Sequence, residues 1–161
     1  MKVNNKAIKI AVSNQKGGVG KTTTVLNLGA ALAVNNRRVL LVDCDPQHHL
    51  SNWLDWEADG KPTTSDIIFS TVTKQNVDFK NCIRYCEKEN FDFIPSINLL
   101  AGMLGIIAAD DNSSTVISRI FENDYFNENY DYIIFDCQTA LDLLVTNVPV
   151  SYTHLTLPTT E

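Results

Sequence analysis

Residues 14–24, NQKGGVGKTTT, are the stretch whose residue types and spacing could do chemistry. Three glycines free the backbone to turn several amides toward one point, and a helix that follows adds the positive end of its dipole. Such a turn cradles phosphate groups. Lys21 is expected to reach the outer phosphates, and the Thr22 hydroxyl to hold Mg²⁺. The residues predicted to bind the phosphates are Gly17, Gly18, Val19, Gly20, Lys21, Thr22 and Thr23.

Three aspartates follow apolar runs that are typical of buried strands. Asp43 and Asp45 follow RVLLV within the sequence DCDPQ, and Asp136 ends YDYIIFD. Ligands of open α/β sheets bind beyond the carboxyl ends of the strands, so these carboxylates are expected beside the glycine-rich turn. Asp43 and Asp136 are predicted to hold the metal, Asp136 through a water or by accepting a hydrogen bond from Thr22. Asp45 is predicted to orient an attacking water.

Each of these motifs has a structural alternative. A glycine-rich turn can lack a ligand, Asp-Pro commonly starts a turn, and a buried strand can end in aspartate by chance. Their order along the chain favours function, because a strand before the turn and a helix after it are the context that a phosphate-binding loop requires.

The surrounding pattern predicts elements that would position these residues. Ala7 to Ser13 and Arg38 to Val42 are typical of strands buried on both faces, and a helix from about Lys21 to Asn35 joins them in a right-handed βαβ unit. Further predictions are a helix capped by Thr64 or Ser65 that runs through Phe69, a helix starting at Asp78, and a strand from Phe91 to Ile94. Two more helices are predicted, one over 99–109 and one capped by Ser113 or Ser114 that runs to about Phe126. We expect Leu50, Trp53 and Leu54 to pack in the core.

Composition bounds the class of protein. With 161 residues, 44% of them hydrophobic, the chain has enough apolar material for one domain, and the predicted class is α/β with a mostly parallel sheet and helices on both faces, incomplete at its C-terminal side. A net charge of −6 limits any nucleic-acid contact to a local patch of basic residues.

No apolar run is long enough to span a membrane, and no export signal is apparent, so a cytoplasmic protein with reduced cysteines is expected. Cys82 and Cys86 could share a helix face, but they lack further metal ligands at suitable spacing.

The glycine-rich stretch departs from the general phosphate-loop pattern, with Gln15 where that pattern has glycine and with an additional lysine, Lys16. This is the deviant Walker A motif, and residues 7–149 resemble the ParA/MinD family of ATPases. The sequence DPQ followed by a leucine-tryptophan segment resembles ParA/Soj more than MinD. The resemblance implies bound ATP and Mg²⁺, slow hydrolysis and dimerisation on ATP binding. It also implies a ParB-like activator, nonspecific DNA as a partner and association with the nucleoid during plasmid or chromosome partitioning.

The same resemblance implies roles for individual residues. The catalytic residues would be Lys16, Lys21 and Asp45. Of these, Lys16 would reach across a nucleotide-sandwiched dimer to the partner's nucleotide.

This sequence departs from the family's pattern at two places in the regions expected to move with nucleotide state. His48 and His49 replace the small residues, often Gly-Asn, that usually follow DPQ, and Gln138 and Thr139 replace a usual Pro-Pro. Proline stiffens a loop, so its absence is expected to loosen the segment after Asp136.

The end of the chain has a different character. The sequence VSYTHLTLPTTE continues no period of the preceding residues, and most of it matches a translated transposase adaptor from sequencing libraries. We therefore divide the chain into residues 1–149, the N-terminal portion of an ATPase domain, and 150–161, a non-native tail. The alternative is a genuine short C-terminal strand.

Three other functions fit parts of the pattern. A MinD-like enzyme would share the phosphate loop but act at a membrane through a C-terminal amphipathic helix. A truncated fragment would bind nucleotide weakly and catalyse nothing. A reductase similar to the nitrogenase iron protein would need cluster-ligating cysteines, which the spacing here does not provide.

Overall fold

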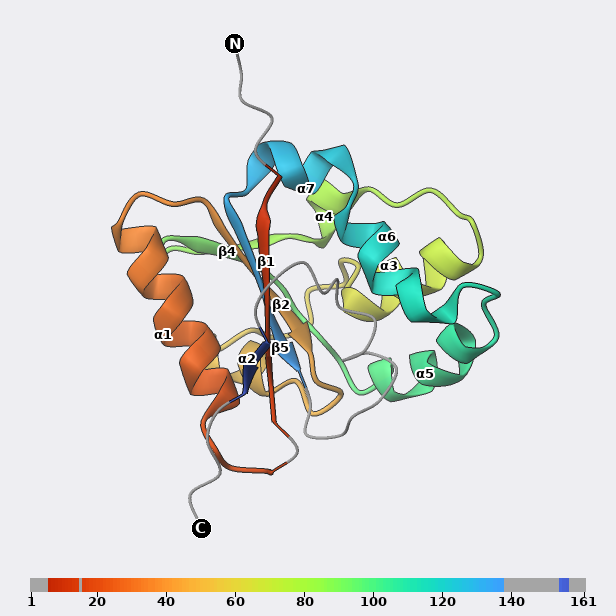
Figure 1. Ribbon diagram of the computed structural model, residues 1–161, viewed down its shortest axis with the longest axis horizontal. Coiled ribbons are helices and arrows are strands. Elements are labelled where there is room, and N and C mark those ends of the chain that lie inside the picture. Colours follow the sequence, from red (N-terminus) through yellow and green to blue (C-terminus); the bar gives the residue numbers. More distant parts are fainter. Residues whose placement is uncertain (1–5, 15, 138–153, 157–161) are drawn as a thin grey trace.

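The computed structural model describes residues 6–14, 16–137 and 154–156. Within them, a six-stranded sheet of order β3-β4-β2-β5-β1-β6 forms the middle layer (Figure 1). Every neighbouring pair is parallel except β3 and β4. The strands are β1 Ile8–Ser13, β2 Val39–Cys44, β3 Arg84–Cys86, β4 Phe91–Ile94, β5 Tyr132–Cys137 and β6 His154–Thr156.

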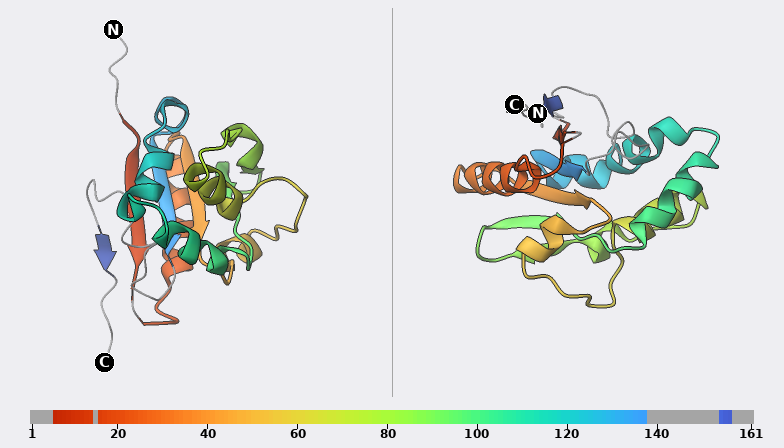
Figure 2. Two further views of the ribbon diagram at one scale, coloured as in Figure 1. Left: turned by 90° about the vertical axis from the view of Figure 1, so that its right-hand side faces the viewer. Right: turned by 90° about the horizontal axis from the view of Figure 1, so that it is seen from below.

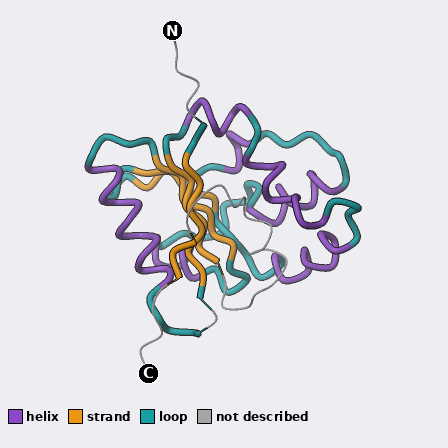
Figure 3. Tube along the Cα trace, in the orientation of Figure 1, coloured by secondary structure: helices purple, strands orange, loops and turns teal. Residues whose placement is uncertain are grey.

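Helices lie on both sides of this sheet, as the two further views and the tube show (Figures 2 and 3). Helix α1 covers one face and α3, α5, α6 and α7 gather on the other. The helices are α1 Lys21–Val34, α2 His49–Trp53, α3 Thr64–Val72, α4 Phe79–Cys82, α5 Leu100–Ala108, α6 Val116–Phe121 and α7 Asp124–Asn129, with a short 3-10 helix η1 Ser113–Thr115. The predicted α/β class, with a mostly parallel sheet and helices on both faces, is therefore confirmed.

The central strands are buried on both faces, as a parallel sheet with two helical layers requires. All six residues of β2 are buried. Leu41 packs in the cluster on the α1 side, whereas Leu40 and Val42 pack in the larger cluster on the opposite side. Helix α1 approaches closely at Gly29, where an added Cβ would lie 2.9 Å from Cδ2 of Leu41. The two apolar clusters thus hold the sheet from either side and fix the strand ends that carry the polar residues.

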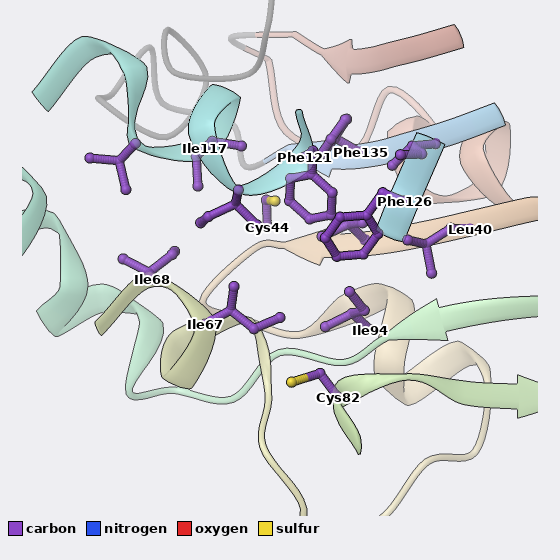
Figure 4. Packing of buried hydrophobic residues seen from close by; sticks show 14 of the residues in the cluster. Leu40, Cys44, Ile67, Ile68, Cys82, Ile94, Ile117, Phe121, Phe126 and Phe135 are labelled. Carbon is purple, nitrogen blue, oxygen red and sulfur yellow. The ribbon is translucent and has the colours of Figure 1, made fainter. Parts of the chain in front are cut away.

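Aromatic side chains fill the middle of the larger cluster (Figure 4). The ring of Phe121 lies 4.7 Å from that of Phe126 and meets Phe135 edge to face at 4.9 Å, measured between centroids. Such tilted and edge-to-face contacts are the favoured geometries of aromatic pairs. They attach α6 and α7 to β5 directly behind the strand end that bears Asp136.

Several predicted elements have different boundaries in the structure. The helix expected from Thr64 or Ser65 is capped one residue earlier, where the backbone amide and hydroxyl of Thr63 both donate to Oδ2 of Asp66, at 2.7 and 2.8 Å. The single helix expected to end at Phe126 is divided into η1, α6 and α7, because Asn123 caps a new start by accepting a hydrogen bond from the amide of Tyr125 at 2.9 Å.

Two side-chain predictions were wrong. Trp53 is 68% exposed, because α2 has only five residues and ends there. Leu50 is buried in the core cluster and Leu54 packs against it, as expected. Cys82 and Cys86 do not share a helix face, since the backbone becomes extended at Ile83 and Cys86 lies in β3. No group of three or more His, Cys, Asp or Glu side chains suited to a metal ion occurs in the described part of the chain.

Strand β6 is the described portion of the C-terminal segment. It pairs in parallel with β1, with Val12 opposite Leu155. The assignment of 150–161 as a non-native tail stays a prediction. Gln138 and Thr139 lie outside the described residues. Within the described ranges, no helix has the length and apolar character needed to cross a bilayer.

Arg84 at the start of β3 fastens the long segment after α2 to the sheet. Its side chain is only 8% exposed, and its guanidinium contacts both carboxylate oxygens of Asp59, at 3.0 and 2.7 Å. It also donates to the carbonyl oxygens of Lys61, Pro62 and Cys82 and lies over the ring of Trp56. The Arg84 side chain lowers the pKa of the Asp59 carboxyl through these hydrogen bonds.

We predict that Arg84→Met destabilises the fold by about 2 to 3 kcal/mol, because three carbonyl groups and a carboxylate lose their donor together. Urea denaturation of the purified chain measures this cost. Arg119→Met is the matched control: Arg119 pairs with Asp110 at 2.9 Å but is 38% exposed, and its loss should cost less than about 1 kcal/mol. Equal costs for the two variants would contradict the prediction.

Candidate functional site

The glycine-rich turn lies between β1 and α1, as the sequence predicts. Gly18 and Gly20 adopt left-handed backbone angles, with φ of 72° and 85°, that residues with a side chain adopt only at a cost. The backbone amide of Lys16 donates to Oδ1 of Asn14 at 2.9 Å, which shapes the start of the turn. Gly20 precedes the first residue of α1 and has no side chain to cap its amides. These amides are therefore available to an anion at the helix start.

A cavity of about 400 Å³ opens over this turn. It is lined by Gly17, Gly18, Val19, Gly20, Lys21, Thr22, Thr23, Asp45, Gln47, His49 and Trp53. All seven residues predicted to bind phosphates thus line one cavity together with Asp45. Lys21 is buried, whereas Lys16 is exposed and is not among the lining residues.

Asp136 lies at the carboxyl end of β5 and is almost fully buried. Its Oδ2 accepts a hydrogen bond from Thr22 Oγ1 at 2.7 Å, as predicted from the sequence. Its Oδ1 is buried with no hydrogen-bond partner among the described residues. Burial, helped by the nearby charges of Asp43 and Asp45, raises the pKa of this carboxyl to about 7, although the hydrogen bond from Thr22 and the charge of Lys21 oppose the rise.

Asp43 is completely buried at the end of β2, and both its oxygens already accept hydrogen bonds from the protein. Oδ1 accepts from the Asp45 amide at 3.0 Å, and Oδ2 accepts from the amide and hydroxyl of Ser51 at 2.9 and 2.7 Å. Burial raises the pKa of Asp43 to about 6, although the bonds from Ser51 oppose this rise. Its predicted role as a metal ligand stays a prediction, and this geometry favours a role in holding the turn after β2.

Asp45 lies on that turn with both carboxylate oxygens directed to local partners. Oδ1 accepts from the Gln47 amide at 2.9 Å, and Oδ2 lies 2.8 Å from Nδ1 of His49. His48 adopts a left-handed backbone with φ of 45°, a conformation that glycine takes more easily. Its Nδ1 lies 3.3 Å from the carbonyl oxygen of Pro46, so the two adjacent histidines have different partners.

Sequence reasoning missed several residues of this site. Ser51 and His49 bind the carboxylates of Asp43 and Asp45 from the short helix α2. Trp53 lines the cavity although it was assigned to the core. Only Gln47, as part of DPQ, stood in a recognisable motif. The other contacts depend on the sharp turn at His48, which brings α2 back toward the end of β2.

The residues fit a nucleotide phosphate with Mg²⁺. The turn supplies amides and a buried lysine, and the unpartnered buried oxygen of Asp136 beside the Thr22 hydroxyl supplies hard oxygen donors for the metal. Magnesium commonly takes only one or two protein ligands and completes its shell with water and phosphate, so Thr22 and Asp136 are enough protein ligands for it.

A family model described as an AAA domain matches residues 7–160. The Sporulation initiation inhibitor protein Soj of Bacillus subtilis is 39% identical over 150 residues, covering 92% of this chain and 56% of that protein. The chain belongs to the ParA/MinD family of P-loop ATPases. Another member, the Chromosome partitioning protein ParA of Caulobacter vibrioides, is 34% identical over 139 residues, covering 86% of this chain and 50% of that protein.

The fold of this ParA/MinD-family chain also matches a solved structure. Cobyrinic acid a,c-diamide synthase from Mycobacterium smegmatis, crystallised with an ATP analogue and magnesium, gives a TM-score of 0.77 at 32% identity. The match covers 88% of this chain and 55% of that one. The chain spans about half the length of the curated relatives it matches.

The raised pKa of Asp136 predicts how pH affects stability in the nucleotide-free protein with EDTA present. The folded state binds the proton of the Asp136 carboxyl more tightly than the unfolded chain does. The free energy of unfolding therefore falls as pH rises from about 4 to 7, and the loss is complete above that range. The shift from 3.8 to about 7 corresponds to on the order of 4 kcal/mol.

Asp136→Asn should therefore raise the free energy of unfolding at pH 8 by at least about 2 kcal/mol, and the gain should shrink at pH 5. Urea denaturation at both values measures it. Asp131→Asn serves as the control of opposite sign, because Arg38 lowers the pKa of Asp131 through a hydrogen bond, so its replacement should cost stability at pH 8. A pH-independent gain in Asp136→Asn would contradict the assignment.

Proposed function

We propose that this chain carries the phosphate-binding and hydrolytic site of a ParA/Soj-type partition ATPase. It binds Mg·ATP and hydrolyses it slowly, and nucleotide-dependent dimerisation drives plasmid or chromosome partitioning. The observation that carries the proposal is the contact of Thr22 with the buried, half-satisfied carboxylate of Asp136 beside a glycine cradle. Similarity to Soj, to ParA and to an enzyme crystallised with an ATP analogue and magnesium supports ATP and Mg²⁺ as the cofactors.

The residues divide the work as follows. Lys21 and the amides from Gly17 to Thr23 hold the phosphates, and Thr22 and Asp136 hold Mg²⁺. When bound, the metal neutralises charge on the phosphate oxygens. Asp45 orients the attacking water from the cavity wall. Asp43 keeps Asp45 in place through the hydrogen bond from the Asp45 amide.

Lys16 acts outside its own cavity in this proposal. Its exposure, and its position outside the cavity lining, support a role toward a second subunit, where its charge would stabilise the transition state on the partner's nucleotide. A homodimer formed on ATP binding, a ParB-like activator, nonspecific DNA and a cytoplasmic, nucleoid-associated location complete the proposal.

Two lysine substitutions test this function. Lys21→Ala should weaken Mg·ATP binding at least about tenfold, because a buried cation leaves the phosphate site. Lys16→Ala should keep Mg·ATP affinity but lose ATP-dependent dimerisation or turnover. Isothermal titration, phosphate release and light scattering measure these effects. Wild-type dimerisation and turnover in Lys16→Ala would contradict the role of Lys16, and unchanged binding in Lys21→Ala would contradict the site.

A further inference from the structure

His49 is a polar residue of the cavity wall to which the P-loop mechanism assigns no task. It lies at the first position of α2, four residues after Asp45, and its Nδ1 is 2.8 Å from Oδ2 of that aspartate. Both side chains line the cavity over the glycine-rich turn. An ionised carboxylate only accepts hydrogen bonds, so Nδ1 of His49 is the donor in this pair.

Four hydrogen bonds hold Asp45, and they differ in kind. Its amide donates to Asp43, its carbonyl oxygen accepts from the amide of His48, and its Oδ1 accepts from the amide of Gln47, so three of these contacts involve the backbone of the turn. Among the described residues, His49 alone holds the carboxylate through a side chain. With Oδ1 alone fixed, the carboxylate group can still rotate, whereas a donor on each oxygen sets its plane. The remaining lone pairs then keep one direction relative to the cavity.

The exposure of the two side chains separates this contact from an ordinary surface ion pair. The side chain of His49 is 59% exposed, but that of Asp45 is only 12% exposed. Because the imidazole of His49 is in contact with solvent, it buries little surface, and its contribution to the stability of the fold is expected to be small. The main effect of His49 is therefore on the orientation of the Asp45 carboxylate. Small errors in the orientation of a reacting group lower the rate of the chemical step strongly.

We propose that His49 is a positioning residue for ATP hydrolysis, which acts through Asp45 by holding its carboxylate toward the phosphate cavity. This inference rests on the proposed function for its catalytic consequence, while its structural part concerns the nucleotide-free protein. The left-handed turn at His48 is what returns the chain so that His49 can reach Asp45.

The kinetic test compares His49→Ala with His49→Asn. The amide nitrogen of asparagine lies about where Nδ1 lies, so His49→Asn should keep the hydrogen bond and retain kcat within about threefold. His49→Ala should lower kcat about 10- to 100-fold while the affinity for Mg·ATPγS changes less than about twofold. Adding His49→Ala to Asp45→Asn should cause no further loss, because the effect passes through Asp45.

His48→Asn is the matched control, since asparagine tolerates the left-handed backbone and the side chain of His48 lies against the carbonyl oxygen of Pro46, not against Asp45. Its kcat should equal that of the wild type. Wild-type kcat in His49→Ala, an equal loss in His48→Asn, or failure of His49→Asn to retain activity would each overturn the proposal.

A second measurement does not depend on nucleotide. The Gln47 amide is protected by Oδ1 of Asp45, so in the nucleotide-free protein its hydrogen exchange should become at least about tenfold faster in His49→Ala but not in His49→Asn. If the wild type fails to bind or hydrolyse ATP, the proposed function is wrong, and this exchange then decides the inference alone. Unchanged Gln47 protection in His49→Ala overturns it.

Discussion

The hydrogen bond from Thr22 to Asp136 joins the first turn of α1 to the end of β5, and the rest of the site depends on it. Strand β5 lies between β2 and β1, so its carboxyl end is the centre of the ligand edge. The carboxylate of Asp136 can be buried there only because a hydroxyl and a nearby lysine charge offset part of the cost. That same contact fixes where α1, and with it the glycine-rich turn, stands relative to the sheet.

Three aspartates at the carboxyl edge of the sheet lower the stability of the nucleotide-free protein. Asp43 and Asp136 are paired residues on adjacent strands, and burial raises the pKa of both carboxyls. The protein satisfies the oxygens of Asp43 with its own donors but leaves one oxygen of Asp136 without a partner in the described part of the chain. This asymmetry separates a carboxylate that organises structure from one that is available to a ligand, and a stability cost at the second is typical of functional sites.

The sequence predicted the features that depend on local pattern. The βαβ unit, the phosphate loop, and the contact of Thr22 with Asp136 follow from apolar runs, glycine spacing and the rule that parallel strands end at one edge. Trp53 was misassigned because helical spacing says which residues share a face, but not that α2 ends before a second turn can bury it. Cys86 was misassigned because one extended residue, Ile83, converts a helical pattern into an edge strand. The partners of Asp43 and Asp45 were missed because they depend on the turn at His48.

Ser51 and His49 connect α2 to its surroundings in different ways, and this difference determines which part of the cavity wall can rearrange when a ligand binds. Ser51 is buried, donates to Asp43 and accepts from the backbone amide of Ser96 at 3.0 Å, so it ties α2 to the ends of both β2 and β4. His49, half a turn earlier, is exposed, and its side chain is hydrogen-bonded to Asp45. Movement of α2 as a body would break buried hydrogen bonds, whereas reorientation of Asp45 and His49 would not. The structure therefore confines inexpensive rearrangement to the segment from Asp45 to His49, in which Asp45, Gln47 and His49 line the phosphate cavity.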